Sequence, residues 1–123
     1  MKMESRPADD NPEVILLEVE GVVDPVNVTD FFQFVNKLFK DGTRMLVMDL
    51  SWANYLSSGA LSVIADAFKK AESLGGGVVI SNASDSLKEL FSVVQFDRIF
   101  DFYPDITSAV ASFSDADADG DKP

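Results

Sequence analysis

Residues 45–80 decide the fold, and they read MLVMDLSWANYLSSGALSVIADAFKKAESLGGGVVI. Met45–Leu50 is a mostly apolar run of the kind that forms a buried strand. From residue 58 to residue 74 the apolar side chains fall on one stripe and the charged ones largely off it, which indicates a surface helix. Gly75–Gly77 ends this helix, and Val78–Ile80 begins another strand. The order strand, loop, helix, strand predicts an α/β layer with parallel neighbouring strands.

Ser57 and Ser58 follow the loop expected at residues 51–56, so their two adjacent hydroxyl groups lie at the start of the helix. The first N–H groups of a helix have no intrahelical partner, and together with the helix dipole they favour a nearby negative charge. A phosphorylated serine can therefore be accommodated here without refolding, which makes this position a candidate switch. Serine is also a preferred N-cap residue, so a purely structural helix cap is the competing interpretation.

Composition narrows the class of protein and of partner. A length of 123 residues suits one domain, and a hydrophobic content of 46% fits a globular chain that buries a core. The formal net charge of −11 disfavours nucleic acids and anionic membranes as partners, because both are negatively charged. We therefore expect another protein, with a basic face, as the partner.

The chain contains neither cysteine nor histidine. This excludes disulfides, thiolate chemistry, histidine-dependent serine triads and histidine-based zinc sites. We expect no enzymatic activity, no cofactor and no metal site. No apolar run approaches the roughly 20 residues that span a bilayer, and the N-terminus lacks the apolar core of a signal peptide. A cytoplasmic protein without membrane insertion is the expectation.

The two ends of the chain differ in composition from the segment between them. Residues 1–13 are polar and contain prolines, and we expect a flexible lead-in. Residues 114–123 alternate Asp with Ala and match only the opening of a calcium-binding EF-hand loop, so we expect a disordered acidic tail. The elements expected between these ends are a strand at 14–20, a helix at 28–39 opened by Asp24-Pro25, strands at 45–50 and 78–81, a helix at 58–74, a short helix capped by Ser84, an edge strand or turn at 98–103, and a helix at 106–113.

The segment 14–113 resembles the STAS domain family, which comprises anti-sigma-factor antagonists and related regulatory modules. The motifs that carry the resemblance are Glu18–Asp24, Val47–Ser51, Ser57–Leu61, Ala71–Ile80 and Leu90–Phe100. The resemblance implies a single α/β domain over residues 14–113. Its sheet would be mixed but mostly parallel, with four to five strands, and about four helices would accompany it.

In the antagonist branch of this family, a serine in an Asp-Ser-x-Gly motif is phosphorylated by a GHKL-type serine kinase that is also the anti-sigma factor. A serine phosphatase reverses the modification. The resemblance implies that Ser57 is the phosphoacceptor, with Ser58 as a minor candidate at the variable position, and that Gly59 opens the helix. Asp24 matches an acidic position near the phosphosite. The implied function is that of a bacterial cytoplasmic phosphoprotein that regulates transcription and is switched off by phosphorylation.

Two residues depart from the family pattern. Leu56 stands where the motif has its aspartate, and Gln95 stands where a glycine is common. An aliphatic side chain at position 56 changes both the local charge and the surface that a kinase would contact. The alternative function is therefore a STAS subunit that is not phosphorylated, such as the accessory protein of an ABC-type lipid transporter or a stressosome-like scaffold.

We predict a partner-binding surface centred on residues 52–59. Trp52 and Tyr55 are contact candidates because amphipathic aromatic residues often anchor interfaces, although half-buried structural roles are the competing interpretation. The full predicted set is Asp24, Trp52, Tyr55, Leu56, Ser57, Ser58 and Gly59. Two aspartates also have structural interpretations, Asp24 as a helix N-cap and Asp49 as a hydrogen-bond acceptor within its strand.

Overall fold

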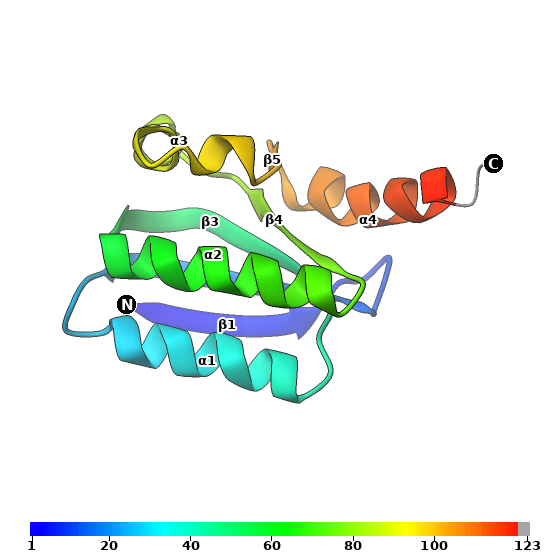
Figure 1. Ribbon diagram of the computed structural model, residues 1–123, viewed down its shortest axis with the longest axis horizontal. Helices are drawn as coiled ribbons and strands as arrows, with labels where there is room; N and C mark the ends of the chain where they lie inside the picture. The colour runs from blue at the N-terminus through cyan, green and yellow to red at the C-terminus, as the bar shows by residue number, and fades with distance from the viewer. Residues whose placement is uncertain (121–123) are drawn as a thin grey trace.

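A computed structural model describes residues 1–120, with the side chains of residues 1–114, as an α/β fold built on one five-stranded sheet (Figure 1). The strands are β1 (Lys2–Pro7), β2 (Val14–Val23), β3 (Met45–Leu56), β4 (Gly77–Ser81) and β5 (Phe102–Tyr103). They lie in chain order, with β1 antiparallel to β2 and all other neighbours parallel. The helices are α1 (Val28–Lys40), α2 (Ser58–Ser73), α3 (Asp85–Val93) and α4 (Ile106–Gly120), with a 3-10 turn η1 (Phe96–Arg98). The predicted fold class is confirmed.

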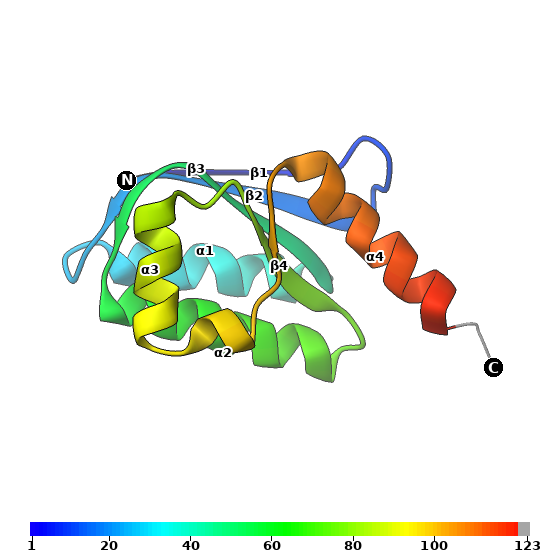
Figure 2. The ribbon, with the colours of Figure 1, turned by 90° about the horizontal axis from the view of Figure 1, so that it is seen from above.

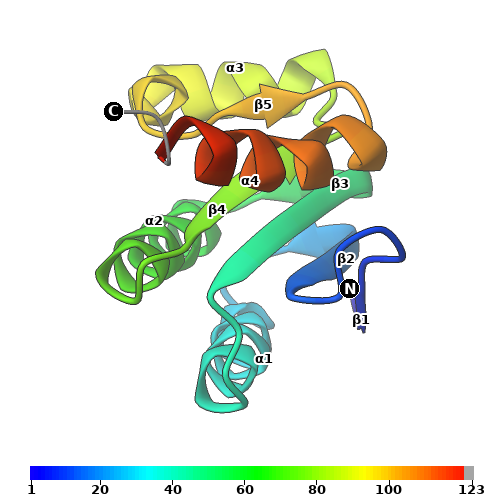
Figure 3. The same ribbon diagram turned by 90° about the vertical axis from the view of Figure 1, so that its right-hand side faces the viewer.

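Different helices cover the two faces of the sheet (Figure 2 and Figure 3). α1 and α2 pack on one face, here called the inner face, and α4 packs on the other, the outer face. Side chains alternate between the two faces along a strand. In β2, for example, Leu17 and Val19 point into the inner core, whereas Val14 and Leu16 point toward α4. This alternation assigns a face to every residue of β2 and to its partners in β3.

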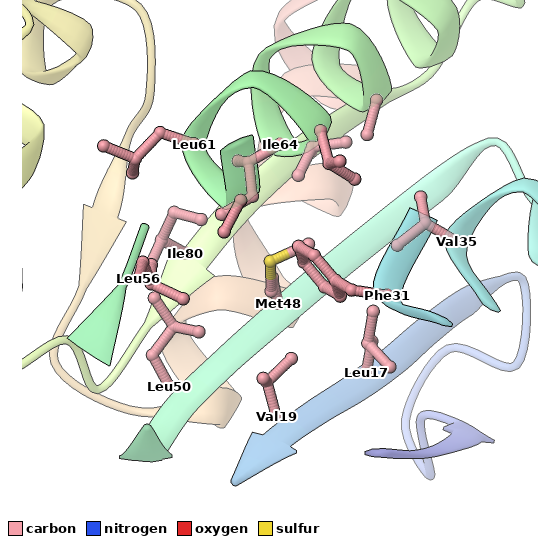
Figure 4. Packing of buried hydrophobic residues seen from close by; sticks show 14 of the residues in the cluster. Leu17, Val19, Phe31, Val35, Met48, Leu50, Leu56, Leu61, Ile64 and Ile80 are labelled. Carbon is pink, nitrogen blue, oxygen red and sulfur yellow. The ribbon is translucent and has the colours of Figure 1, made fainter. Parts of the chain in front are cut away.

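The inner core joins both helices to the central strands (Figure 4). Phe31 of α1, Ile64 of α2 and Met48 of β3 all belong to this core, and their side chains are fully buried. Burial of this kind contributes about 1.5–3 kcal/mol for each large apolar side chain. The amphipathic stripes that predict α1 and α2 are therefore the surfaces by which these helices are held on the sheet.

The N-terminal residues form a strand, which contradicts one expectation from the sequence. The lead-in expected to be flexible contains β1, which pairs with β2 from Lys2 opposite Glu20 to Pro7 opposite Ile15. Its side chains are almost all exposed, and Met3 packs against the inner core. An edge strand that buries so little carries no apolar alternation, which is the pattern by which strands are predicted.

β3 is longer than expected, because the loop predicted at residues 51–56 continues as strand to Leu56. The pairing with β2 shifts between Glu18 and Glu20, and again between Gly21 and Val22. At each shift β3 supplies one residue more than β2, which is the count that defines a β-bulge. The two bulges interrupt the alternation of β3 and bend its path toward α2.

The segment after β4 packs against α2 through aromatic rings. Phe100 meets Phe68 of α2 at 5.1 Å and Phe91 of α3 at 5.9 Å between ring centroids, both in edge-to-face geometry. Ser84 caps α3 as predicted, by accepting the N–H of Leu87. Gln95 has a φ of 62°, in the left-handed region that favours glycine. This explains physically why a glycine suits that position.

The C-terminal helix extends past its predicted end. The carboxylate of Asp105 accepts the backbone N–H of Ser108 at 2.7 Å, and this hydrogen bond lowers the pKa of Asp105. α4 then runs to Gly120 rather than ending near Phe113. The backbone of the expected disordered tail is therefore helical as far as Gly120, and residues 121–123 lie outside the described residues.

Gly76 yields a stability prediction for the junction between α2 and β4. A Cβ at this position would overlap the backbone carbonyl of Arg44, which accepts the N–H of Gly77 at 2.9 Å. Because the obstacle is backbone, Gly76→Ala should lower the free energy of unfolding by about 2–3 kcal/mol. Gly77→Ala is the matched control, since its Cβ would meet only the Phe113 ring edge, at 3.4 Å. Urea unfolding compares the two, and a Gly76→Ala protein as stable as the parent chain would contradict this packing.

Candidate functional site

The predicted switch residues lie where β2 and β3 end side by side. Val23 pairs with Leu56 at the last register position, and the next N–H, that of Ser57, donates to the Val23 carbonyl at 2.9 Å. Ser57 is the N-cap of α2, and its Oγ accepts the N–H of Ala60 at 3.3 Å. The ends of two strands thus hold the first turn of α2. We call residues Ser57, Ser58 and Gly59 the helix mouth.

The two serines of the helix mouth differ in exposure. Ser57 is 7% exposed, with its hydroxyl turned into the cap, whereas Ser58 is exposed to solvent. The capping role predicted for Ser57 is therefore confirmed. Because the hydroxyl of Ser57 satisfies only one first-turn N–H, the positive end of the α2 dipole remains available to an anion.

Asp24 shapes the turn beside the helix mouth instead of capping α1 as predicted. Its carboxylate accepts the N–H groups of Val26 and Asn27 at 2.9 and 3.0 Å, and the N-cap of α1 is Asn27. The Asn27 amide closes the turn by accepting the N–H of Asp24 and donating to the Val22 carbonyl, both at 2.9 Å. This reciprocal pair fixes the backbone between β2 and α1.

The turn exposes a residue that sequence reasoning missed. Val26 is 91% exposed, the largest exposed fraction among the large apolar side chains that the structure describes. Its signal in the sequence is an apolar residue between a turn-forming Asp24-Pro25 pair and the Asn27 cap. An apolar side chain in this position is a contact candidate next to the helix mouth.

Gly59 brings α2 close to the start of α1. A Cβ at Gly59 would lie 3.4 Å from Cγ2 of Val28, which is tight packing for a new atom. The small residue therefore lets the helix mouth lie close to the start of α1. The turn of residues 24–27, here called the Asp24 turn, leads directly into that start. Gly59 thus lies in the first turn of α2, where the sequence places the glycine that opens the helix.

Leu56 does not belong to that surface. It is 1% exposed and packs in the inner core with residues such as Leu50 and Ile80 (Figure 4). The expectation that Leu56 is a partner contact is corrected, because its pairing with Val23 points its side chain to the inner face. Because Leu56 stands in place of the aspartate of the Asp-Ser-x-Gly motif, no carboxylate directly precedes Ser57.

Trp52 and Tyr55 lie on the other face of the sheet. Trp52 pairs with Glu20 and Tyr55 with Val22, and these β2 residues alternate with the core-facing Val23. All four therefore point to the outer face, away from α1 and α2. Trp52 is 70% exposed and Tyr55 47% exposed, so the half-buried structural interpretation is wrong for Trp52. The single predicted surface is thus divided between two faces of the protein.

The buried Asp49 forms a polar cluster where β4 ends beside the middle of β3. Its carboxylate accepts the hydroxyls of Ser51 at 3.0 Å and Ser81 at 2.9 Å, and the amide of Asn82 at 2.8 Å. Asn82 has a φ of 57°, and its N–H donates to the Tyr103 carbonyl at 3.0 Å. The predicted structural role of Asp49 is confirmed, because the cluster joins β3, β4 and β5 where α3 begins.

The comparison with known families decides the identity of the fold. A model of the STAS domain matches residues 5–109 of the chain. The chain belongs to the STAS domain family. Among the relatives of this STAS domain is BtrV of Bordetella bronchiseptica, named as an anti-sigma factor antagonist. The two are 26% identical over 98 residues, which cover 80% of this chain and 84% of BtrV.

Solved structures show the same fold. A Thermotoga maritima protein described as an anti-sigma factor antagonist has 21% sequence identity and a TM-score of 0.83, with 91% of this chain and 94% of that one covered. The phosphorylated form of SpoIIAA from Bacillus has 11% identity and a TM-score of 0.69, with 90% and 98% covered. This STAS domain is therefore antagonist-like in fold. Within residues 1–120 it has no helix with the length and apolar content needed to cross a bilayer.

The cap geometry predicts how variants of the helix mouth differ in stability. Ser57→Ala removes the acceptor of the Ala60 N–H and should lower the free energy of unfolding by about 1 kcal/mol. Ser57→Asp keeps an acceptor at the positive end of α2 and should retain most of the stability. Ser58→Ala is the matched control, because its exposed hydroxyl makes no hydrogen bond in the described structure. Thermal unfolding measures all three, and equal losses at positions 57 and 58 would contradict the cap.

Proposed function

We propose that this STAS domain is an anti-sigma-factor antagonist that binds a GHKL-type serine kinase, itself the anti-sigma factor, through the helix mouth and the Asp24 turn. The kinase phosphorylates Ser57, the phosphate ends the complex, and a serine phosphatase restores the binding form. In this proposal the protein is a transcription regulator of the bacterial cytoplasm and not an enzyme.

The observation that carries this proposal is the position of the Ser57 hydroxyl at the N-cap of α2. A phosphate on this oxygen would lie at the positive end of a 16-residue helix, near N–H groups that have no intrahelical acceptor. The domain can therefore carry the modification while its sheet and core keep their arrangement. SpoIIAA, which has been solved in a phosphorylated form, supports the idea that this fold tolerates phosphate.

The same position explains how the modification would control binding. A phosphate adds about −1.5 to −2 charges at neutral pH. Ser58 and Gly59 follow this point in the exposed first turn of α2, and Val28 of α1 lies close to Gly59, so a partner surface that matches the neutral form would have to bury the new charge. A penalty of about 3 kcal/mol lowers affinity by more than a hundredfold.

Access to Ser57 requires a small local opening. The hydroxyl is buried in its cap and must leave the Ala60 N–H before it can attack a phosphoryl donor. The hydrogen bond of an N-cap is worth about 1 kcal/mol, and helix ends open locally at low cost. Bound kinase can supply this opening by contacting the exposed Ser58 and the Asp24 turn.

One observation favours a second candidate function. Ser57 is buried and its preceding residue is the core leucine Leu56, so the helix mouth lacks the acidic neighbour found in the phosphorylated motif. A STAS subunit that binds constitutively needs no accessible hydroxyl. The second candidate is therefore an unphosphorylated accessory subunit of an ABC-type lipid transporter or a stressosome-like scaffold.

The test is to isolate native complexes of the full chain from its source cells, identify the bound partner and map phosphoserine by mass spectrometry. We expect a GHKL-type kinase as the partner and phosphate on Ser57. With the purified kinase, Ser57→Asp should weaken binding by about a hundredfold, the effect of a charge penalty of about 3 kcal/mol. Ser57→Ala should bind within a few-fold of the parent chain, because it removes the phosphoacceptor without adding charge.

The control for stability is the unfolding series described above, which separates lost binding from lost folding. Phosphate on Ser58 alone would reassign the switch to the exposed serine. A stable complex with a transporter ATPase, together with an unmodified Ser57, would contradict the antagonist function and support the second candidate.

A further inference from the structure

The outer face of the sheet is covered where the strands begin and open where they end. α4 packs through Ala109, Val110 and Phe113 on the early residues of the strands, such as Leu16 and Val47. Figure 1 shows α4 at the end of the sheet from which β3 starts, and Figure 3 shows it on the face opposite α1 and α2. The later outer-face residues of β2 and β3 lie beyond this helix.

That open region carries an aromatic and apolar patch. Trp52 and Tyr55 of β3 stand beside their register partners Glu20 and Val22 of β2, and all four side chains point outward. Trp52 is the only tryptophan of the chain and one of the most exposed large apolar residues that the structure describes. We call Trp52, Tyr55 and Val22 the outer patch.

Carboxylates border the outer patch on the side of β1. Trp52 lines a small hollow together with Glu4, Glu18 and Glu20, and Lys2, which is opposite Glu20 in the β1–β2 register, also lies there. Glu18 is paired with Arg6 at 3.0 Å and Glu4 with Lys2 at 3.3 Å. Glu20, which is cross-strand from Trp52, takes part in no ion pair among the described side chains.

We propose that the outer patch is a second docking surface, which takes an arginine-bearing basic segment of a protein partner. The guanidinium would stack on the Trp52 ring and pair with the Glu20 carboxylate, while apolar atoms of the segment cover Tyr55 and Val22. Arginine suits this site because its planar cation both stacks on aromatic rings and binds carboxylates. The chain's net charge of −11 adds long-range attraction for such a partner.

This surface is distinct from the helix mouth. The outer patch lies on the face opposite α2, whereas the helix mouth begins α2 and is continuous with the Asp24 turn. One partner can therefore occupy the helix mouth while a basic segment occupies the outer patch. The inference does not depend on whether Ser57 is phosphorylated.

The test titrates the full chain with a synthetic peptide that contains two arginines and follows the fluorescence of Trp52, the sole tryptophan. The matched peptide carries neutral citrulline in place of each arginine. We expect the arginine peptide to change Trp52 emission saturably and to perturb the indole and Val22 amide signals by NMR. Glu20→Gln should weaken binding by about two- to fivefold, the scale of one exposed ion pair.

Glu89→Gln is the matched control, because it removes one exposed carboxylate from α3 and leaves the outer face unchanged. Ser58→Asp is the control for the helix mouth and should leave peptide binding intact even where it disrupts kinase binding. Equal losses for Glu20→Gln and Glu89→Gln would overturn the proposal in favour of diffuse charge attraction. Equal binding of the citrulline peptide would overturn it by showing that the guanidinium charge is not what the outer patch recognises. A change in Trp52 emission that depends on protein concentration alone would also overturn it, since the occupant would be a second copy.

Discussion

The parallel pairing of β2 with β3 is the constraint on which the rest of the structure depends. It begins with Val14 opposite Met45 and ends with Val23 opposite Leu56, where the Ser57 N–H donates to the Val23 carbonyl. That last hydrogen bond positions the first turn of α2. The same strand end leads into the Asp24 turn, so the start of α1 and the start of α2 meet at one corner of the fold. The helix mouth exists because two strands end together.

The two bulges in this pairing determine which face the exposed aromatic residues of β3 occupy. Without them, strict alternation along β3 would place Trp52 and Tyr55 on opposite sides of the sheet, because the two residues are separated by an odd number of positions. The bulge between Glu18 and Glu20 turns Trp52 to the outer face, and the bulge between Gly21 and Val22 keeps Tyr55 on that face and Leu56 in the inner core. A small domain thereby presents a helix mouth at one place and an aromatic patch at another. A module of this kind can join two partners with little rearrangement of its core.

Much of the fold could be predicted because burial in the core requires apolar residues at regular spacings along the sequence. The apolar stripes of α1 and α2 and the buried start of β3 follow directly from the side chains that reach the inner core. β1 could not be predicted in this way, since an edge strand is held by backbone pairing and buries little beyond Met3. In the site, the Ser57 cap follows from local helix chemistry. The side of the sheet on which Trp52 lies depends on the bulges, and the burial of Leu56 depends on the strand register. Neither can be read from a local sequence pattern.

The proposed switch requires that the helix mouth accept a phosphate on Ser57 without rearrangement of the domain. The most direct measurement is a comparison of amide NMR spectra of the unmodified chain and the chain phosphorylated at Ser57. We expect large shifts confined to residues 23–28 and 56–61, with the Trp52 indole signal unchanged. Shifts that spread to core residues such as Phe31 and Met48, or a collapse of signal dispersion, would contradict it.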